Sequence, residues 1–235
     1  MRTDPLWMQA FLAVHVAAGA LCLMLVPVAL AFRKGGAQHR RWGRIYYWSM
    51  AVLAATALTM ALFRPILFLA LVAVLSFYLV FSGRRVLALK ALASGGSAAP
   101  TDWAAALVTF AACACLAGFG AWRPAWVQNM GIVAIVLGTV GMVSTLTDML
   151  RFANPPRQPD FWVGVHLQKF MGSYIAIWTA FSSVTLSQMF PSNTLAVWLW
   201  PTALGVPAIT AASIYYRRKV SPREAKPTSL QAAAL

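Results

Sequence analysis

The sequence predicts an all-α, polytopic membrane protein with seven transmembrane helices, its amino terminus outside the membrane and its carboxyl terminus inside. The 235-residue chain is 60% hydrophobic and only 10% charged, and its mean hydropathy of +0.70 is far from the balance of soluble globular domains. Seven apolar stretches approach or exceed the roughly 20 residues that a spanning helix needs. Lys and Arg residues stand in short blocks between these stretches, a pattern that is typical of membrane topology and not of nucleic-acid binding.

The predicted helices follow one another with short connections. They cover residues 6–32, 45–63, 66–82, 101–122, 126–150, 161–189 and 194–216. The apolar run of the first helix is longer than the core of a signal peptide, so we expect it to be retained. Only Arg64 and Pro65 separate the second helix from the third; proline at a helix start and an arginine that reaches the headgroups suit a tight hairpin.

The distribution of positive charge tests the assignment of seven helices and indicates how they are oriented in the membrane. Sixteen of the nineteen Lys and Arg residues fall on one side of the predicted membrane, and only Arg2, Arg64 and Arg123 fall on the other. Cytoplasmic connections carry the excess of positive charge, so the amino terminus is predicted outside and the carboxyl terminus inside.

The rest of the chain is simple in organisation. Residues 1–220 are predicted to form a single transmembrane domain. Residues 221–235 are polar and then alanine-rich, which predicts a disordered cytoplasmic tail. Residues 87–100 are rich in glycine, serine and alanine and are predicted to be a flexible inner loop.

Ionisable residues inside a membrane are energetically costly and often functional, so the helix faces on which they lie are informative. A spacing of three and four residues puts a set of small residues and one acid on a single face of the fifth helix: Gly131, Ala134, Gly138, Gly141, Thr145 and Asp148. Such a face admits a neighbouring helix, so Asp148 is predicted to point into the bundle near its inner end. The same spacing puts seven residues on one face of the sixth helix: His166, Lys169, Ser173, Ala176, Ala180, Ser183 and Ser187.

His15 is predicted to belong to a second locus. It shares a face of the first helix with Gly19 and Cys22, and glycine there leaves room for a flat cofactor or a neighbouring backbone. Its depth in the membrane differs from that of His166 by about 19 Å at 1.5 Å per residue. Metal–nitrogen bonds are only about 2.0–2.1 Å long, so one metal ion does not join the two.

Three residues are expected to converge at the inner face as metal ligands: His39 from the basic loop, Asp148 and His166. Two imidazoles and a carboxylate are the ligand set of many non-haem iron and catalytic zinc sites. Haem b is the alternative cofactor, with His15 and His166 as candidate ligands and His15 at its own locus nearer the outer side. Two haems with paired histidine ligands would need four histidines, and the chain has three. Lys169 is the candidate catalytic residue, placed to hold an anionic small molecule or a lipid headgroup.

Two functions remain open at this point. The first is an integral inner-membrane protein that binds a metal or haem in a polar pocket and has a redox or hydrolytic role. The second is a non-catalytic transporter, sensor or assembly partner, in which Asp148 pairs with Lys169 or an inner-loop arginine and the histidines serve as structural hydrogen-bonding groups. Membrane lipid is the expected partner in both, and nucleic acid in neither.

Two segments carry a family resemblance: HVAAGALCLMLVPVALAFRKGGAQHRRWGRIYYWSM from His15, and GVHLQKFMGSYIAIWTAF from Gly164. They resemble a large bacterial family of predicted membrane proteins catalogued as domain of unknown function 2306, over nearly the whole chain. The resemblance implies a bacterial inner-membrane protein. The residues that carry it are His15, His39, Arg40, Gly43, His166, Ser173, Thr179 and Phe181.

Overall fold

The computed structural model describes residues 5–64, 66–123 and 130–220, and the regular structure in these ranges is entirely helical. The α-helices are α1 (Leu6–Ala31), α2 (Ala37–Phe63), α3 (Leu67–Arg85), α4 (Pro100–Trp122), α5 (Met130–Ala153), α6 (Phe161–Met189) and α7 (Thr194–Val220), with a short 3-10 helix, η1 (Lys90–Ser94). The predicted all-α class is confirmed. The predicted tail, 221–235, lies outside the described residues.

Six of the described α-helices are long and apolar enough to cross a membrane. The exception is α6, whose first half carries His166, Gln168 and Lys169 and whose second half is rich in serine and threonine. Six such helices indicate a multi-pass membrane protein.

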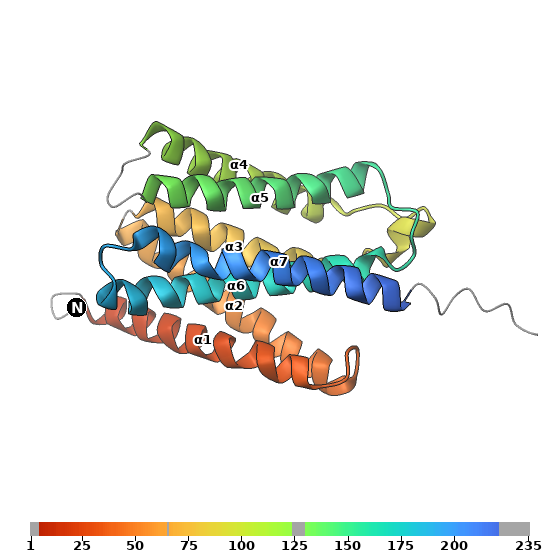
Figure 1. Ribbon diagram of the computed structural model, residues 1–235, viewed down its shortest axis with the longest axis horizontal. Helices are drawn as coiled ribbons and strands as arrows, with labels where there is room; N and C mark the ends of the chain where they lie inside the picture. The colour runs from red at the N-terminus through yellow and green to blue at the C-terminus, as the bar shows by residue number, and fades with distance from the viewer. Residues whose placement is uncertain (1–4, 65, 124–129, 221–235) are drawn as a thin grey trace, which may run out of the picture.

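The helices run up and down, and α3 lies in the middle of the bundle (Figure 1). It packs against α2, α4, α5 and α6, while α1 with α2, α4 with α5 and α6 with α7 form neighbouring pairs. The ends of α1, α3 and α5 and the starts of α2, α4 and α6 therefore lie together, at the end of the bundle opposite the amino terminus.

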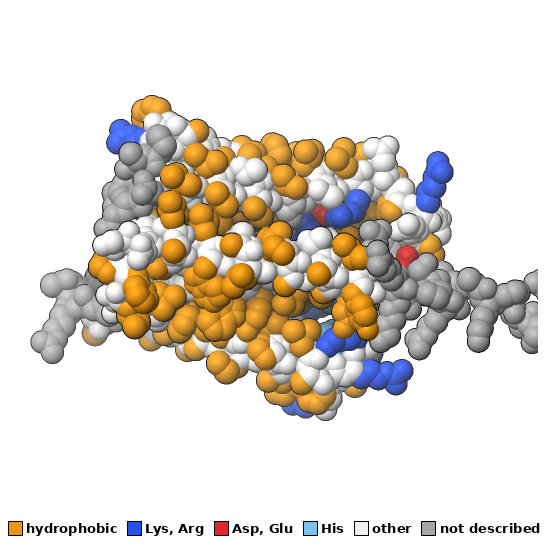
Figure 2. Space-filling model, in the orientation of Figure 1, with side chains coloured by type: hydrophobic (Ala, Val, Ile, Leu, Met, Phe, Trp, Pro, Cys, Tyr) orange, Lys and Arg blue, Asp and Glu red, His pale blue; other side chains and the backbone are white. Residues whose placement is uncertain are grey.

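We call this the basic end, because the helix ends and connections there carry the following cations: Arg33, Lys34, Arg40, Arg41, Arg44, Arg84, Arg85, Lys90, Arg151 and Arg157. In Figure 2 the blue side chains gather toward it, and the long apolar flanks are orange. Arg64 and Arg123 follow α2 and α4 at the opposite end.

The prediction for the start of α2 was wrong by eight residues. The helix begins at Ala37, after Gly35 with a positive φ of 76°, so His39 lies in its first turn and not in a loop. Hydropathy marks where the apolar run begins, whereas backbone hydrogen bonding continues through Gln38 and Arg40, which are good helix formers.

The inner loop was also predicted incorrectly, because its first half is folded. Leu89 and Leu92 are buried beside and within η1, where they pack with Val86, Phe161 and Val165. These two leucines, three residues apart, form an apolar side of the loop. The prediction relied on the overall composition of the segment, in which small residues outnumber the leucines.

The small-residue face predicted on α5 is confirmed, since all six of its residues are buried. A Cβ atom at Gly138 would lie 2.6 Å from the Cys113 carbonyl oxygen of α4, so the two backbones approach closely. On α6 the predicted face holds only in part: Lys169 and Ser173 are buried but Ala180 is exposed. Its spacing repeats every 3.5 residues, and a straight helix of 3.6 residues per turn drifts away from such a pattern.

Candidate functional site at the basic end

The carboxylate of Asp148 is at the centre of a buried polar cluster. The residue is 4% exposed and stands in the penultimate turn of α5. Its Oδ2 accepts a hydrogen bond from the Tyr78 hydroxyl of α3 at 2.6 Å and pairs with the Lys169 ammonium of α6 at 2.5 Å. Its Oδ1 accepts a hydrogen bond from Arg151 Nη1 at 2.8 Å. One side chain thus ties α3, α5 and α6 together.

Lys169 is equally buried and has two kinds of partner. Its Nζ atom, in addition to the pair with Asp148, donates to the Ser144 hydroxyl at 2.6 Å and lies 3.2 Å from the Ser144 carbonyl oxygen. Nζ also lies 5.1 Å from the centre of the Tyr78 ring, a cation–π contact. The expected pairing of Asp148 with Lys169 and an arginine is therefore present. The ammonium predicted to hold a substrate contacts Asp148 and Ser144 in the structure.

A second ion pair joins α3 to α4, and it was not predicted from the sequence. Arg85, the last residue of α3, binds Asp102 of α4 through both carboxylate oxygens, with Nε–Oδ1 and Nη2–Oδ2 distances of 2.6 and 2.8 Å. The Ala99 backbone N–H also donates to Asp102 Oδ2 at 3.0 Å, which fixes the start of α4. A signal was available, because Asp102 is one of only five acidic residues in the chain and follows a proline suited to the first turn of a helix.

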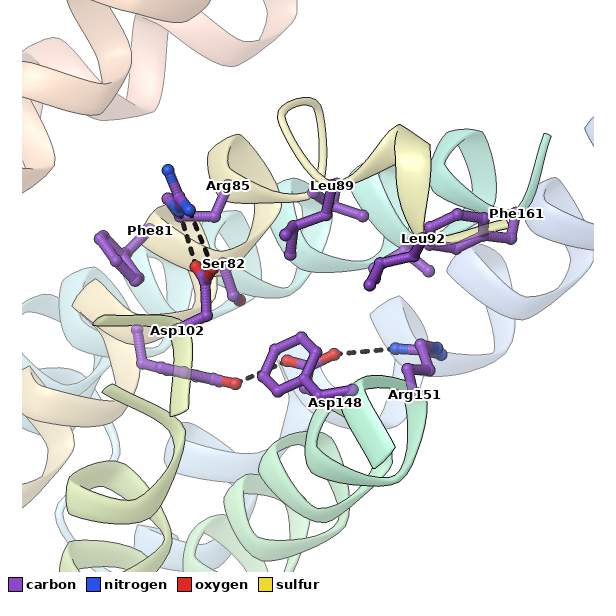
Figure 3. A pocket seen from close by; sticks show the side chains of 13 residues that line it. Phe81, Ser82, Arg85, Leu89, Leu92, Asp102, Asp148, Arg151 and Phe161 are labelled. Atoms are coloured by element: carbon purple, nitrogen blue, oxygen red, sulfur yellow. Dashed lines mark hydrogen bonds and ion pairs between the residues drawn. The ribbon is translucent and has the colours of Figure 1, made fainter. Parts of the chain in front are cut away.

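The two ion pairs face a common pocket that is partly open to the surface. Figure 3 shows the Arg85–Asp102 pair and the Arg151–Asp148 pair at separate places on its wall. The remaining lining comes from α3, η1, α5 and α6 and is mostly apolar: Tyr78, Phe81, Ser82, Val86, Leu89, Leu92, Phe152, Phe161 and Val165. A few charged groups are thus held against a largely apolar wall at the basic end.

His39 and His166 meet at the contact between α2 and α6. Their ring centroids lie 6.4 Å apart with an angle of 68° between the ring planes. His166 Nδ1 is 2.8 Å from the Gly83 carbonyl oxygen of α3, and His39 Nδ1 is 3.0 Å from the Ala29 carbonyl oxygen of α1. The structure thus brings two of the three predicted ligands together, with His39 on a helix and not in a loop.

These hydrogen bonds assign the tautomer of both rings. A carbonyl oxygen only accepts, so Nδ1 of each ring carries a proton and donates it, and in the neutral form of the imidazole Nε2 keeps its lone pair. Neither Nε2 has a hydrogen-bond partner among the described residues. A histidine whose second nitrogen donates to a backbone carbonyl is the usual arrangement of a metal ligand.

His15 lies apart from this pair, in the half of α1 nearer the amino terminus. Its Nδ1 is 3.0 Å from the Thr56 hydroxyl and 3.2 Å from the Leu53 carbonyl oxygen of α2. A Cβ atom at Gly19 would meet the Leu53 side chain of α2 at an ordinary 3.5 Å, so a side chain and not a backbone lies nearest to this glycine.

The structure does not assemble the predicted set of three ligands. Within the described ranges, no group of three His, Cys, Asp or Glu residues is close enough to hold a metal ion. His166 turns toward His39 and Gly83, whereas the carboxylate of Asp148 is directed to Tyr78, Lys169 and Arg151. The spacing along each helix predicted which residues face inward, but it contains no information on which inward faces meet.

Comparison of the chain with protein-family models, with curated proteins and with solved structures finds no match. The resemblance to the family of unknown function stays a prediction.

Proposed function

We propose that the protein binds a transition-metal ion, or the iron of a haem, through His39 and His166 at the cytoplasmic end of the bundle, in a redox or hydrolytic role. The observation that carries the proposal is the shared geometry of the two rings, each of which donates Nδ1–H to a backbone carbonyl and leaves Nε2 free. Imidazole nitrogen suits zinc, copper, iron and nickel.

The separation of the rings supports the same assignment. The two ring centroids lie 6.4 Å apart, so His39 and His166 would be the residues that hold the metal ion or the haem iron. The bound group would supply Lewis-acid or redox chemistry at this end of the bundle.

The proposal includes a topology and a location. We place all seven helices across the bacterial inner membrane, with the amino terminus outside and the basic end in the cytoplasm. Helix α6 has 29 residues, a length of about 43 Å, and it packs against α1, α3 and α7. Its polar residues near the basic end contact protein, as the buried Lys169 does, so a span is compatible with its composition.

Metal analysis of the purified protein tests the cofactor. We expect a stoichiometric transition metal, or a Soret band, in the wild type, and loss of either in His166→Ala and in His39→Ala. His15→Ala is the matched control, because it removes a part-buried histidine of the other locus and should keep the cofactor. Equal cofactor content in all four proteins would contradict the assignment.

A second function rests on a different observation. The Asp148 carboxylate is fully engaged by Tyr78, Lys169 and Arg151, as expected of an interior network in a non-catalytic transporter, sensor or assembly partner. Under this alternative the wild type carries no metal or haem even when it is produced with both in excess. His166→Ala then changes only the yield of folded protein.

A further inference from the structure

We propose that the pocket between α3, α4, α5 and α6 binds a phosphate group or a similar oxyanion, supplied by a free solute or by a lipid headgroup. The binding residues are Arg151 and Arg85, which both line the pocket. The inference goes beyond the proposed cofactor site and uses none of its histidines.

The balance of charge gives the first argument. Among the described residues of this cluster, three cations face two carboxylates: Arg85 is matched by Asp102, while Lys169 and Arg151 share Asp148. Both carboxylates and Lys169 are at least 95% buried. Uncompensated charge is costly where water is scarce, so the remaining positive charge favours an anion in the pocket.

The donors of Arg151 give the second argument. Only its Nη1 binds Asp148, and its Nε and Nη2 atoms have no hydrogen-bond partner among the described residues. The side chain is 26% exposed and lines the pocket (Figure 3). A guanidinium with free N–H groups on one edge matches the spacing of phosphate oxygens.

The walls of the pocket give the third argument. Leu89, Leu92 and Phe161 line it from η1 and the start of α6. Apolar walls lower the local dielectric and strengthen the attraction between an arginine and an anion. The pocket is also at the basic end, where phosphate-bearing solutes and the headgroups of the inner leaflet are both within reach under the proposed topology.

Calorimetric titration of the protein in neutral detergent tests the proposal. The probes are inorganic phosphate, with chloride at equal ionic strength as reference, and short-chain phosphatidylglycerol, with phosphatidylcholine as reference. Arg151→Gln should weaken binding by about tenfold or more, because it removes charge-assisted hydrogen bonds. Arg84→Gln is the matched control: it removes the same charge from the neighbour of Arg85, an exposed residue that stacks on Tyr47 outside the pocket.

The two probes separate the sources of the phosphate group. Binding of inorganic phosphate with this dependence on Arg151 supports a free solute, and binding of phosphatidylglycerol alone with the same dependence supports a lipid headgroup. Absence of binding by both probes, or equal losses in the two variants, would overturn the proposal.

A second measurement does not depend on the folding of a variant. In the wild type, bound phosphate or phosphatidylglycerol should protect Arg151 from phenylglyoxal, read by peptide mass spectrometry, and leave Arg84 reactive. Equal reactivity of Arg151 with and without either probe would also overturn the proposal. His166→Ala should keep anion binding, and Arg151→Gln should keep the cofactor, so a failure of one site is distinguishable from a failure of the other.

Discussion

At the scale of single residues, Asp148 and Lys169 depend on each other. Each is buried, and each is the other's closest counter-charge, at 2.5 Å. Tyr78 and Ser144 satisfy further hydrogen-bonding capacity of the pair, which is the condition under which a buried ion pair is tolerated. Loss of one partner leaves an isolated charge inside the bundle.

We therefore expect Asp148→Ala to lower the free energy of unfolding by about 3–5 kcal/mol. The double variant Asp148→Leu with Lys169→Met should recover most of this loss, because apolar residues of similar volume replace both charges. Denaturant unfolding in detergent, followed by tryptophan fluorescence, measures the effect. Asp160→Asn changes an acidic residue outside the cluster and should have little effect. Additive losses in the double variant would show that the two residues do not stabilise each other.

The sequence predicted part of this cluster, and the reason for the gap is physical. Spacing along one helix fixes which residues share a face, so Asp148 and Lys169 were both predicted to point inward and their pairing was foreseen. Tyr78 and Arg85 share one face of α3 with Ser82, at spacings of four and three residues, and this polar signal was not used in the prediction. Their partners, Asp148 and Asp102, come from α5 and α4, and the order of helices in the membrane sets those contacts.

At the scale of elements, α4 and α5 pack closely because a glycine at their contact has no side chain to keep the two backbones apart. Gly138 faces the backbone of α4, where a Cβ atom would lie 2.6 Å from the Cys113 carbonyl oxygen and 2.7 Å from the Ala117 nitrogen. Gly118 of α4 has nothing within 4 Å of the corresponding position. The two glycines therefore differ in packing while both lie in helix interiors.

Substitution by alanine should have opposite effects at these two positions. Gly138→Ala forces the backbones of α4 and α5 apart and should cost about 1–3 kcal/mol of stability. Gly118→Ala meets no obstacle and should be neutral or stabilising by up to about 1 kcal/mol, the difference in helix propensity. Thermal unfolding of both variants in the same detergent measures the contrast. A similar change in both would mean that close backbone approach does not hold this helix pair.

Some of the helix ranges predicted from the sequence agree with the structure to within one residue. The range predicted for α6, 161–189, agrees with the structure, and α1 differs by one residue at its end. The start of α2 was missed because the helix extends beyond its apolar part into the basic segment. That extension has a consequence for the proposed cofactor site, since His39 and His166 are both held on helices, and helices fix side-chain geometry better than loops.

At the scale of the whole molecule, the position of α6 decides the topology. The other six helices are apolar enough to span a membrane, and α6 carries the histidine and lysine on which the candidate sites depend. An even number of spans would leave both termini on one side of the membrane, whereas seven place them on opposite sides. The cations at the basic end favour seven, because they follow the odd-numbered helices.

Reporter fusions test this topology in a bacterial host. Alkaline phosphatase joined after Asn193, between α6 and α7, should be active, since this enzyme folds only outside the cytoplasm. Green fluorescent protein at the carboxyl terminus should fluoresce, since it matures inside. Phosphatase joined after Asn154, between α5 and α6, is the matched control and should be inactive. If α6 does not cross, the fusions after Asn154 and Asn193 will report the same side, and Asp148 and Lys169 will no longer belong to a pair of adjacent spans.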